Sequence, residues 1–356
     1  MAKATKGKSK KILSEASYKF LRKYINTPSP TGFESGGQKL WMEYIKPHVD
    51  EIFTDAYGSV AGIINPTEKF KVVIEAHADE ISWFVNYISD SGLIYVKRNG
   101  GVDHQIAPAK RVLIHGKKGA VKAVFGWPAI HTRIGGGERK DPQPSVENLF
   151  LDCGAKNKKE VEALGIHIGA VATYEEGYDE LAYDYIIGRA LDNRVGGFMI
   201  AEVARLMKER KDKLPFGIYF TNSVQEEIGL RGAEMIAHRI NPDVAIVTDV
   251  CHDSSTPMMN KVRDGELSAG KGPVLSYGPA VQNNLLKHII QVADKNKIEI
   301  QRQAASRSTG TDTDAFAYSN MGVASALISL PLRYMHTTVE MVHKEDVEAV
   351  IELIYA

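Results

Sequence analysis

Histidine and carboxylate side chains recur where buried strands are predicted to end. His77 and Asp79 follow one apolar run, Asp249 ends a second, and His336 follows a third. Because ligands bind at the carboxyl ends of the strands in an open α/β sheet, we expect these side chains to converge. Imidazole and carboxylate ligands without thiolate suit Zn²⁺, Co²⁺ or Mn²⁺.

More acidic residues lie between predicted strands and helices. Asp192 directly precedes a helix, and Glu226 and Glu227 separate a buried strand from the next helix. Taken alone, Asp192 is also explained as a helix N-cap, and the two glutamates as the acidic start of a helix. Taken with the histidines, these carboxylates are sufficient for two metal ions that share one carboxylate. Glu226 then remains as an unliganded base.

Asp79 is suited to orient His77. In an extended chain the two side chains point to the same side. The carboxylate can then accept the spare imidazole N–H and fix the tautomer of a metal-bound histidine. On its own, this pair of residues is also typical of a buried histidine beside a surface acid.

Alternating strands and helices must position these residues. This alternation predicts an α/β fold with a mostly parallel sheet flanked by helices. Residues 82–178 differ, because their short β-rich runs are punctuated by Gly or Pro, as in a small β-barrel or sandwich. We expect a catalytic domain at 12–81 and 179–356, interrupted by this insertion. Strands are predicted at 51–54, 60–64, 72–75, 216–221, 244–247, 299–303 and 324–329, and helices at 12–25, 36–46, 195–208, 229–238, 283–295 and 344–355.

The composition is that of a globular protein. The 356 residues are 44% hydrophobic and 25% charged, and 44 basic residues balance 44 acidic ones, which argues against nucleic-acid or membrane binding. Residues 1–11 hold five lysines and no acid, so we expect a disordered basic tail. The chain shows no signal-like or membrane-spanning apolar stretch, and we expect a cytoplasmic protein. Two cysteines provide neither a disulfide framework nor a thiolate zinc site.

Six segments of the chain resemble the M42 family of metallo-aminopeptidases. These are the tetrahedral (TET) and glutamyl-aminopeptidase-like enzymes, which carry a co-catalytic pair of zinc ions. The resemblance runs from about residue 12 to the C-terminus, and the segments occur in the family's order. They read AHADE, RALDNR, QEEIGLRGA, TDV, GTDTDAF and PLRYMHTTVEM.

The resemblance implies an aminopeptidase that hydrolyses the N-terminal peptide bond of peptides with two divalent ions per subunit. Asp192 would bridge both ions, Glu226 would be the general base, and Asp79 would support His77. The ions themselves would be Zn²⁺, with Co²⁺ or Mn²⁺ as alternatives. Four residues would each bind one ion or the other: His77, Glu227, Asp249 and His336.

The resemblance also implies features beyond the metal ligands. Gly310 and Thr311 would help to bind the substrate, and the peptide bond between Asp192 and Asn193 would be cis. The β-rich insertion would be a dimerisation domain. Dimers would then assemble into a tetrahedral dodecamer.

Two other functions remain open at this point. Glu226 and Glu227 could act as the acid and nucleophile of an endoglucanase-type glycoside hydrolase. Glycosidase activity would survive treatment with a chelator, whereas metallopeptidase activity would be lost. The chain could also be a non-catalytic assembly protein that forms the same shell, although its intact ligand set and Glu226 argue against lost chemistry.

Overall fold

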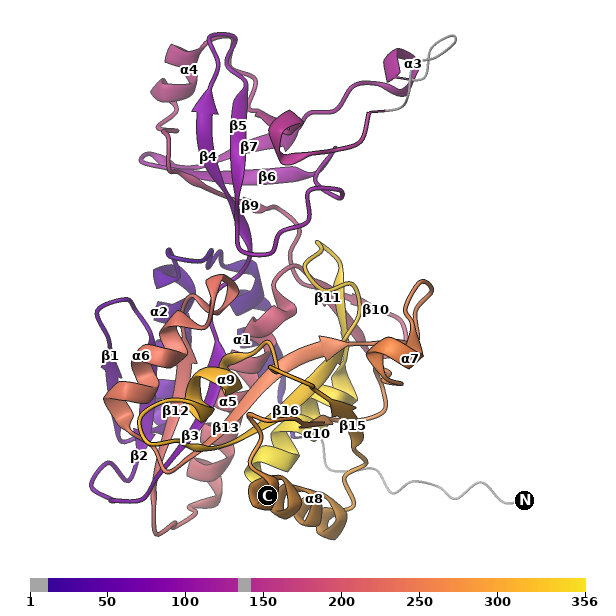
Figure 1. Ribbon diagram of the computed structural model, residues 1–356. Helices are drawn as coiled ribbons and strands as arrows, with labels where there is room; N and C mark the ends of the chain where they lie inside the picture. Colours follow the sequence, from indigo (N-terminus) through magenta and orange to yellow (C-terminus); the bar gives the residue numbers. More distant parts are fainter. Residues whose placement is uncertain (1–11, 134–141) are drawn as a thin grey trace.

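A computed structural model describes residues 12–133 and 142–356 as an α/β domain with a smaller barrel beside it (Figure 1). The tail predicted for residues 1–11 lies outside the described residues. Within the parts of the chain that are described, no helix is long and apolar enough to span a bilayer.

An eight-stranded sheet forms the centre of the larger domain, in the order β1-β2-β12-β3-β13-β16-β14-β15. Its four central strands, β12, β3, β13 and β16, are parallel to one another, which confirms the predicted fold class. The strands are β1 (Glu51–Thr54), β2 (Val60–Ile64), β3 (Lys71–His77), β12 (Gly217–Ser223), β13 (Val244–His252), β14 (Val274–Tyr277), β15 (Gln301–Ala304) and β16 (Ala324–Leu332).

Helices cover both faces of this sheet. Successive residues of β3 show why, because Val73 packs into the core under α6 and Ile74 into the core under α5. A strand that is buried on both faces needs a continuous apolar run, and β3 has one. The face on the side of Ile74 carries α1 (Glu15–Asn26), α2 (Ser35–Ile45), α5 (Leu191–Arg210), α8 (Asn283–Asn296) and α10 (Lys344–Tyr355). The face on the side of Val73 carries α6 (Arg231–Ile240) and α9 (Asp312–Ala317).

The insertion is a closed six-stranded barrel rather than a sandwich, with the order β4-β5-β8-β7-β6-β9. It has a separate core, in which the buried rings of Trp83 and Phe125 meet edge to face. In Figure 1 it stands above the α/β domain. Its elements are β4 (Ser82–Ile88), β5 (Ile94–Asn99), β6 (Arg111–Gly116), β7 (Gly119–Phe125), α3 (Ile130–Arg133), β8 (Phe150–Asp152), α4 (Lys158–Ala163) and β9 (Val171–Tyr174).

A small third sheet, β10-β11-β17, was not predicted. Its strands are three or four residues long, too short for an alternating pattern to be recognised. They are β10 (Asp179–Leu181), β11 (Tyr185–Gly188) and β17 (Glu340–His343). The short helix α7 (Lys261–Asp264) and the 3-10 turns at Lys46–His48, Val146–Asn148 and Glu226–Ile228 complete the described elements.

Candidate metal centre

The structure brings all the expected ligand residues to one edge of the central sheet. His77 is the last residue of β3, and Glu226 and Glu227 lie in the 3-10 turn that follows β12. His336 follows β16. Asp249 was expected to end its strand, but β13 continues to His252 because it stays paired with β16 as far as Leu332.

Asp192 lies between the two histidines. Its Oδ1 is 3.2 Å from Nε2 of His77, and its Oδ2 is 3.2 Å from Nε2 of His336. Its backbone departs from helical geometry at the start of α5, and the peptide bond to Asn193 is cis, as the family resemblance implied. Each oxygen of this one carboxylate thus faces a different imidazole.

Two ligand groups share Asp192. One consists of His77, Asp192 and Asp249, and the other of Asp192, Glu227 and His336; within each, the ligand atoms lie within 4.8 Å of one another. Glu226 belongs to neither group, and its Oε2 is 3.9 Å from Nε2 of His77. The geometry fits two cations bridged by Asp192, with Glu226 beside them.

The titratable groups of the cluster favour bound protons in the absence of metal. Burial, together with the charge of Asp249, raises the pKa of Glu226 to about 10, and burial raises the pKa of Asp249 well above its usual range. Burial opposes the charge of His336, but hydrogen bonds to Asp192 and Glu227 outweigh it and raise its pKa to about 12. Without metal, protons neutralise the site. A bound cation would displace them.

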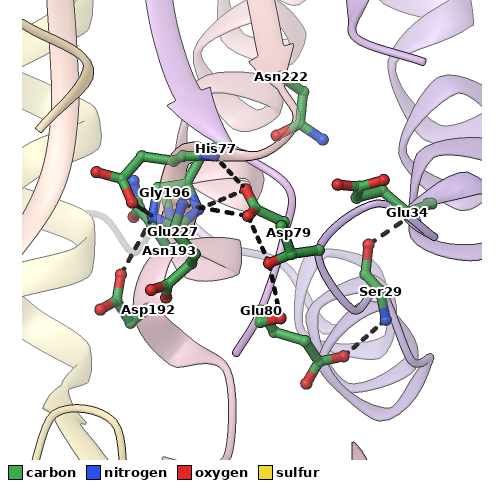
Figure 2. Close-up of polar contacts among 12 residues, drawn as sticks. Ser29, Glu34, His77, Asp79, Glu80, Asp192, Asn193, Gly196, Asn222 and Glu227 are labelled. Atoms are coloured by element: carbon green, nitrogen blue, oxygen red, sulfur yellow. Dashed lines mark hydrogen bonds and ion pairs between the residues drawn. The ribbon is translucent and has the colours of Figure 1, made fainter. Parts of the chain in front are cut away.

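Asp79 contacts both His77 and the turn that carries the two glutamates. Its Oδ1 lies 3.3 Å from Nδ1 of His77, and its two oxygens accept the backbone N–H groups of Glu226 (3.0 Å) and Glu227 (3.3 Å). The hydroxyl of Thr31 donates to the same carboxylate at 2.8 Å. Figure 2 shows Asp79 between His77 and Glu80. A single buried acid therefore orients a histidine and positions both glutamates.

Glu340 has a comparable role that the sequence did not reveal. This buried residue of β17 accepts the backbone N–H of Asp192 at 3.0 Å and that of His336 at 2.8 Å. It thereby holds together two ligands that are far apart in the sequence. The available signal was an acid directly before the apolar pair Met341 and Val342, in the segment that also carries His336.

Two buried arginines, Arg189 and Arg194, flank Asp192 in the sequence, and both pair with Glu80. Glu80 is 3.2 Å from Nε of Arg189 and 3.6 Å from Nη1 of Arg194, and it accepts the N–H of Ser29 at 2.6 Å (Figure 2). Arg194 also donates to backbone carbonyls at the end of α1 and stacks on Tyr24, 4.3 Å from the ring centroid. These contacts fix the start of α5 against the first helix.

A cleft of about 710 Å³ opens from the candidate metal centre, and Gly310 and Thr311 are among the residues that line it. Two buried side chains also line it, Leu327 of β16 (3% exposed) and Ser276 of β14 (1% exposed). Gln303 of the neighbouring strand β15 pairs with Ser276 and also faces the cleft.

Comparisons with known proteins agree with this site. The model of the M42 glutamyl aminopeptidase family matches residues 58–353. A lysyl aminopeptidase of Pyrococcus furiosus is 32% identical over 339 residues, covering 94% of this chain and 95% of the relative.

Solved structures share the whole fold. A TET aminopeptidase of a marine sediment Thaumarchaeota archaeon superposes with a TM-score of 0.90 at 29% identity, covering 96% of this chain and 95% of that one. The TET1 peptidase of Pyrococcus horikoshii, described as able to assemble into a tetrahedron or a large octahedral shell, has a TM-score of 0.84 at 26% identity, covering 95% and 98%. Because the family match spans most of the chain and includes the entire ligand cluster, this chain belongs to the M42 glutamyl aminopeptidase family and is a metal-dependent aminopeptidase.

Proposed function

We propose that the chain removes N-terminal residues from peptides at a dinuclear centre bridged by Asp192. The observation that carries this proposal is the pair of 3.2 Å distances from the two Asp192 oxygens to two different histidines. The first ion would be held by His77 and Asp249, and the second by Glu227 and His336. When bound, divalent ions lower the pKa of a coordinated water and polarise the scissile carbonyl.

Glu226 is the proposed general base. It lies beside His77 of the first ligand group and belongs to neither group, so its carboxylate remains available to a water or a leaving group. It would take the proton of the attacking water and deliver it to the departing amine. Its backbone N–H is held by Asp79, which fixes where this proton is received.

The ions we propose are Zn²⁺, with Co²⁺ or Mn²⁺ as functional substitutes. Each group offers one imidazole nitrogen and carboxylate oxygens, and no cysteine lies in either group. Borderline N/O ligand sets of this kind suit all three metals. Two ions per subunit follow from the two groups.

The inserted barrel is the proposed dimerisation domain, with boundaries at 82–178 between the catalytic segments 12–81 and 179–356. Its separate core supports an independent role. By analogy with the TET1 peptidase of Pyrococcus horikoshii, which can assemble into a tetrahedron or a large octahedral shell, we propose that dimers of this chain assemble further, into a tetrahedral dodecamer.

The alternatives are less well supported. An endoglucanase needs two carboxylates, whereas this site holds two imidazoles and a bridging acid that such a reaction leaves unexplained. A shell-forming protein without activity would have no need of a carboxylate, Glu226, placed beside two complete ligand groups.

Metal removal and return tests the proposal. The full chain, treated with a chelator, should lose hydrolysis of aminoacyl p-nitroanilides and regain it with two equivalents of Zn²⁺ or Co²⁺ per subunit. Because each added cation displaces protons from the cluster, metal affinity should be higher at pH 8 than at pH 6. Activity that survives complete removal of metal, checked by elemental analysis, would contradict a metal-based mechanism.

The cleft also predicts which N-terminal residues are accepted. Among the described residues that line it there is no Lys or Arg, so an acidic substrate side chain would lose its hydration without gaining a cationic side chain as partner. We expect kcat/KM for glutamyl p-nitroanilide to be at least about tenfold below that for the leucyl substrate, a difference of roughly 1.4 kcal/mol.

A matched variant checks the cause of this selectivity. Gln303→Lys adds a cation to the lining of the cleft, on β15, which carries none of the proposed metal ligands, and should raise the glutamyl rate relative to the leucyl rate. A wild-type preference for glutamyl substrates would contradict the prediction and leave the peptidase assignment intact.

A further inference from the structure

The inserted barrel reaches into the metal centre of its own chain. The turn that follows β5 carries Gly100 and Gly101, and Gly101 lines the same cleft as the metal ligands. The carbonyl oxygen of Gly101 lies 3.1 Å from Nδ1 of His336. Since a carbonyl only accepts, Nδ1 carries a proton, and Nε2 is the nitrogen that would bind metal once a cation displaces its own proton.

Glycine is required for this approach. A Cβ at Gly101 would lie 2.8 Å from Nδ1 and 2.9 Å from Cε1 of His336, closer than real side chains pack. A Cβ at Gly100 would lie 3.2 Å from Cβ of Glu227, the neighbouring ligand. Two successive residues of the barrel therefore pack against two ligands of the same proposed ion.

The turn is held firmly on both sides. Val102, the next residue, is 1% exposed within the barrel core, and Asn99 donates to the carbonyl of Thr31 in the α/β domain at 2.9 Å. A second tether is Lys110, just before β6, whose Nζ is 2.6 Å from the hydroxyl of Thr338 in the loop that carries His336. The barrel thus fixes that loop at two points.

We propose that the Gly100–Gly101 turn of the barrel is part of the second metal site: the Gly101 carbonyl fixes the ring of His336 and sets the affinity for the ion held by Asp192, Glu227 and His336. This rests on the proposed dinuclear function. The hydrogen-bond partners of ligating histidines typically change metal affinity by about 10–100-fold. Gly101 acts as a positioning residue, because it works through His336 and touches no substrate.

Gly101→Ala is the direct test, because Gly101 does not adopt a positive φ and only the new methyl group changes. The full chain, freed of metal, is titrated with Zn²⁺ by calorimetry against a competing chelator. We expect the second equivalent to bind about 10–100-fold more weakly and the first to bind as in the wild type. Excess Zn²⁺ should restore kcat.

Gln105→Ala is the matched control, since this exposed residue lies on the same loop of the barrel. It should bind both equivalents normally. Equal weakening of both ions in Gly101→Ala, or no weakening of either, would overturn the inference. Failure of the dinuclear proposal would appear in the wild-type titration, whereas failure of this inference appears only in the difference between variants.

Lys110→Met keeps the test decisive if Gly101→Ala does not fold. The substitution removes the part-buried hydrogen bond from Lys110 to Thr338. It should weaken binding of the second ion by about two- to fivefold, the range of a single exposed ion pair or hydrogen bond. Unchanged binding of the second ion in this variant would then contradict the inference.

Discussion

Glu226→Gln is expected to lower kcat by about 10²–10⁴-fold, the usual contribution of a general base. The amide has nearly the volume of the acid but cannot accept the proton of the attacking water. Both metal ions should stay bound, because Glu226 belongs to neither ligand group. Steady-state kinetics and elemental analysis on the same sample separate the two effects.

Glu234→Gln is the matched control for this substitution, since Glu234 is an exposed residue of α6 in the same sequence segment. It should show wild-type kcat. Near-normal turnover in Glu226→Gln would remove Glu226 from the role of base, and a loss of metal from that variant would make it a ligand instead.

The convergence of the proposed ligands was predictable because they occur at the ends of periodic, apolar elements. The run at β3 identifies a strand buried on both faces, and the strand's end places His77 at the edge where ligands bind. The same argument applies to His336 after β16. Parallel strands bring such ends together, so periodicity alone was enough to expect that the side chains converge.

The residues that hold the ligands were not predictable in this way. Glu340 contacts the backbone of Asp192 across 148 positions, and Gly101 contacts His336 across 235. Neither contact leaves a local pattern, because each depends on how a short strand or a turn packs in three dimensions. The burial of Arg194 was not predictable either, because arginine is rarely fully buried. Its charge is stabilised here by Glu80 and by a carbonyl at the end of α1.

The barrel was expected as an insertion, but its part in the site was not. Its β-rich texture indicates a separate module, and modules of this kind are usually assigned to assembly alone. Because Gly101 contacts His336, a shift of the barrel relative to the α/β domain would also displace a proposed metal ligand. The barrel, proposed as the dimerisation domain, thus contacts a proposed metal ligand within the same subunit.

Asp192→Ala is expected to remove both ions rather than one. Each oxygen of Asp192 faces a different histidine, so its loss leaves only His77 with Asp249 in one group and Glu227 with His336 in the other. Removal of a direct ligand should cost more than the roughly 10–100-fold loss that follows a change in its hydrogen-bond partner. Elemental analysis should therefore find less than one ion per subunit, with activity lost in parallel.

Asp192→Asn discriminates between a bridge and a simple ligand. An amide retains one acceptor oxygen, so it can serve one ion but not two. We expect this variant to hold at most one ion per subunit and to remain inactive, whereas a change to an exposed acid such as Asp90→Asn should leave both ions in place. Two ions bound to Asp192→Ala would show that the two groups are independent, and the shared carboxylate would then lose its role as the bridge.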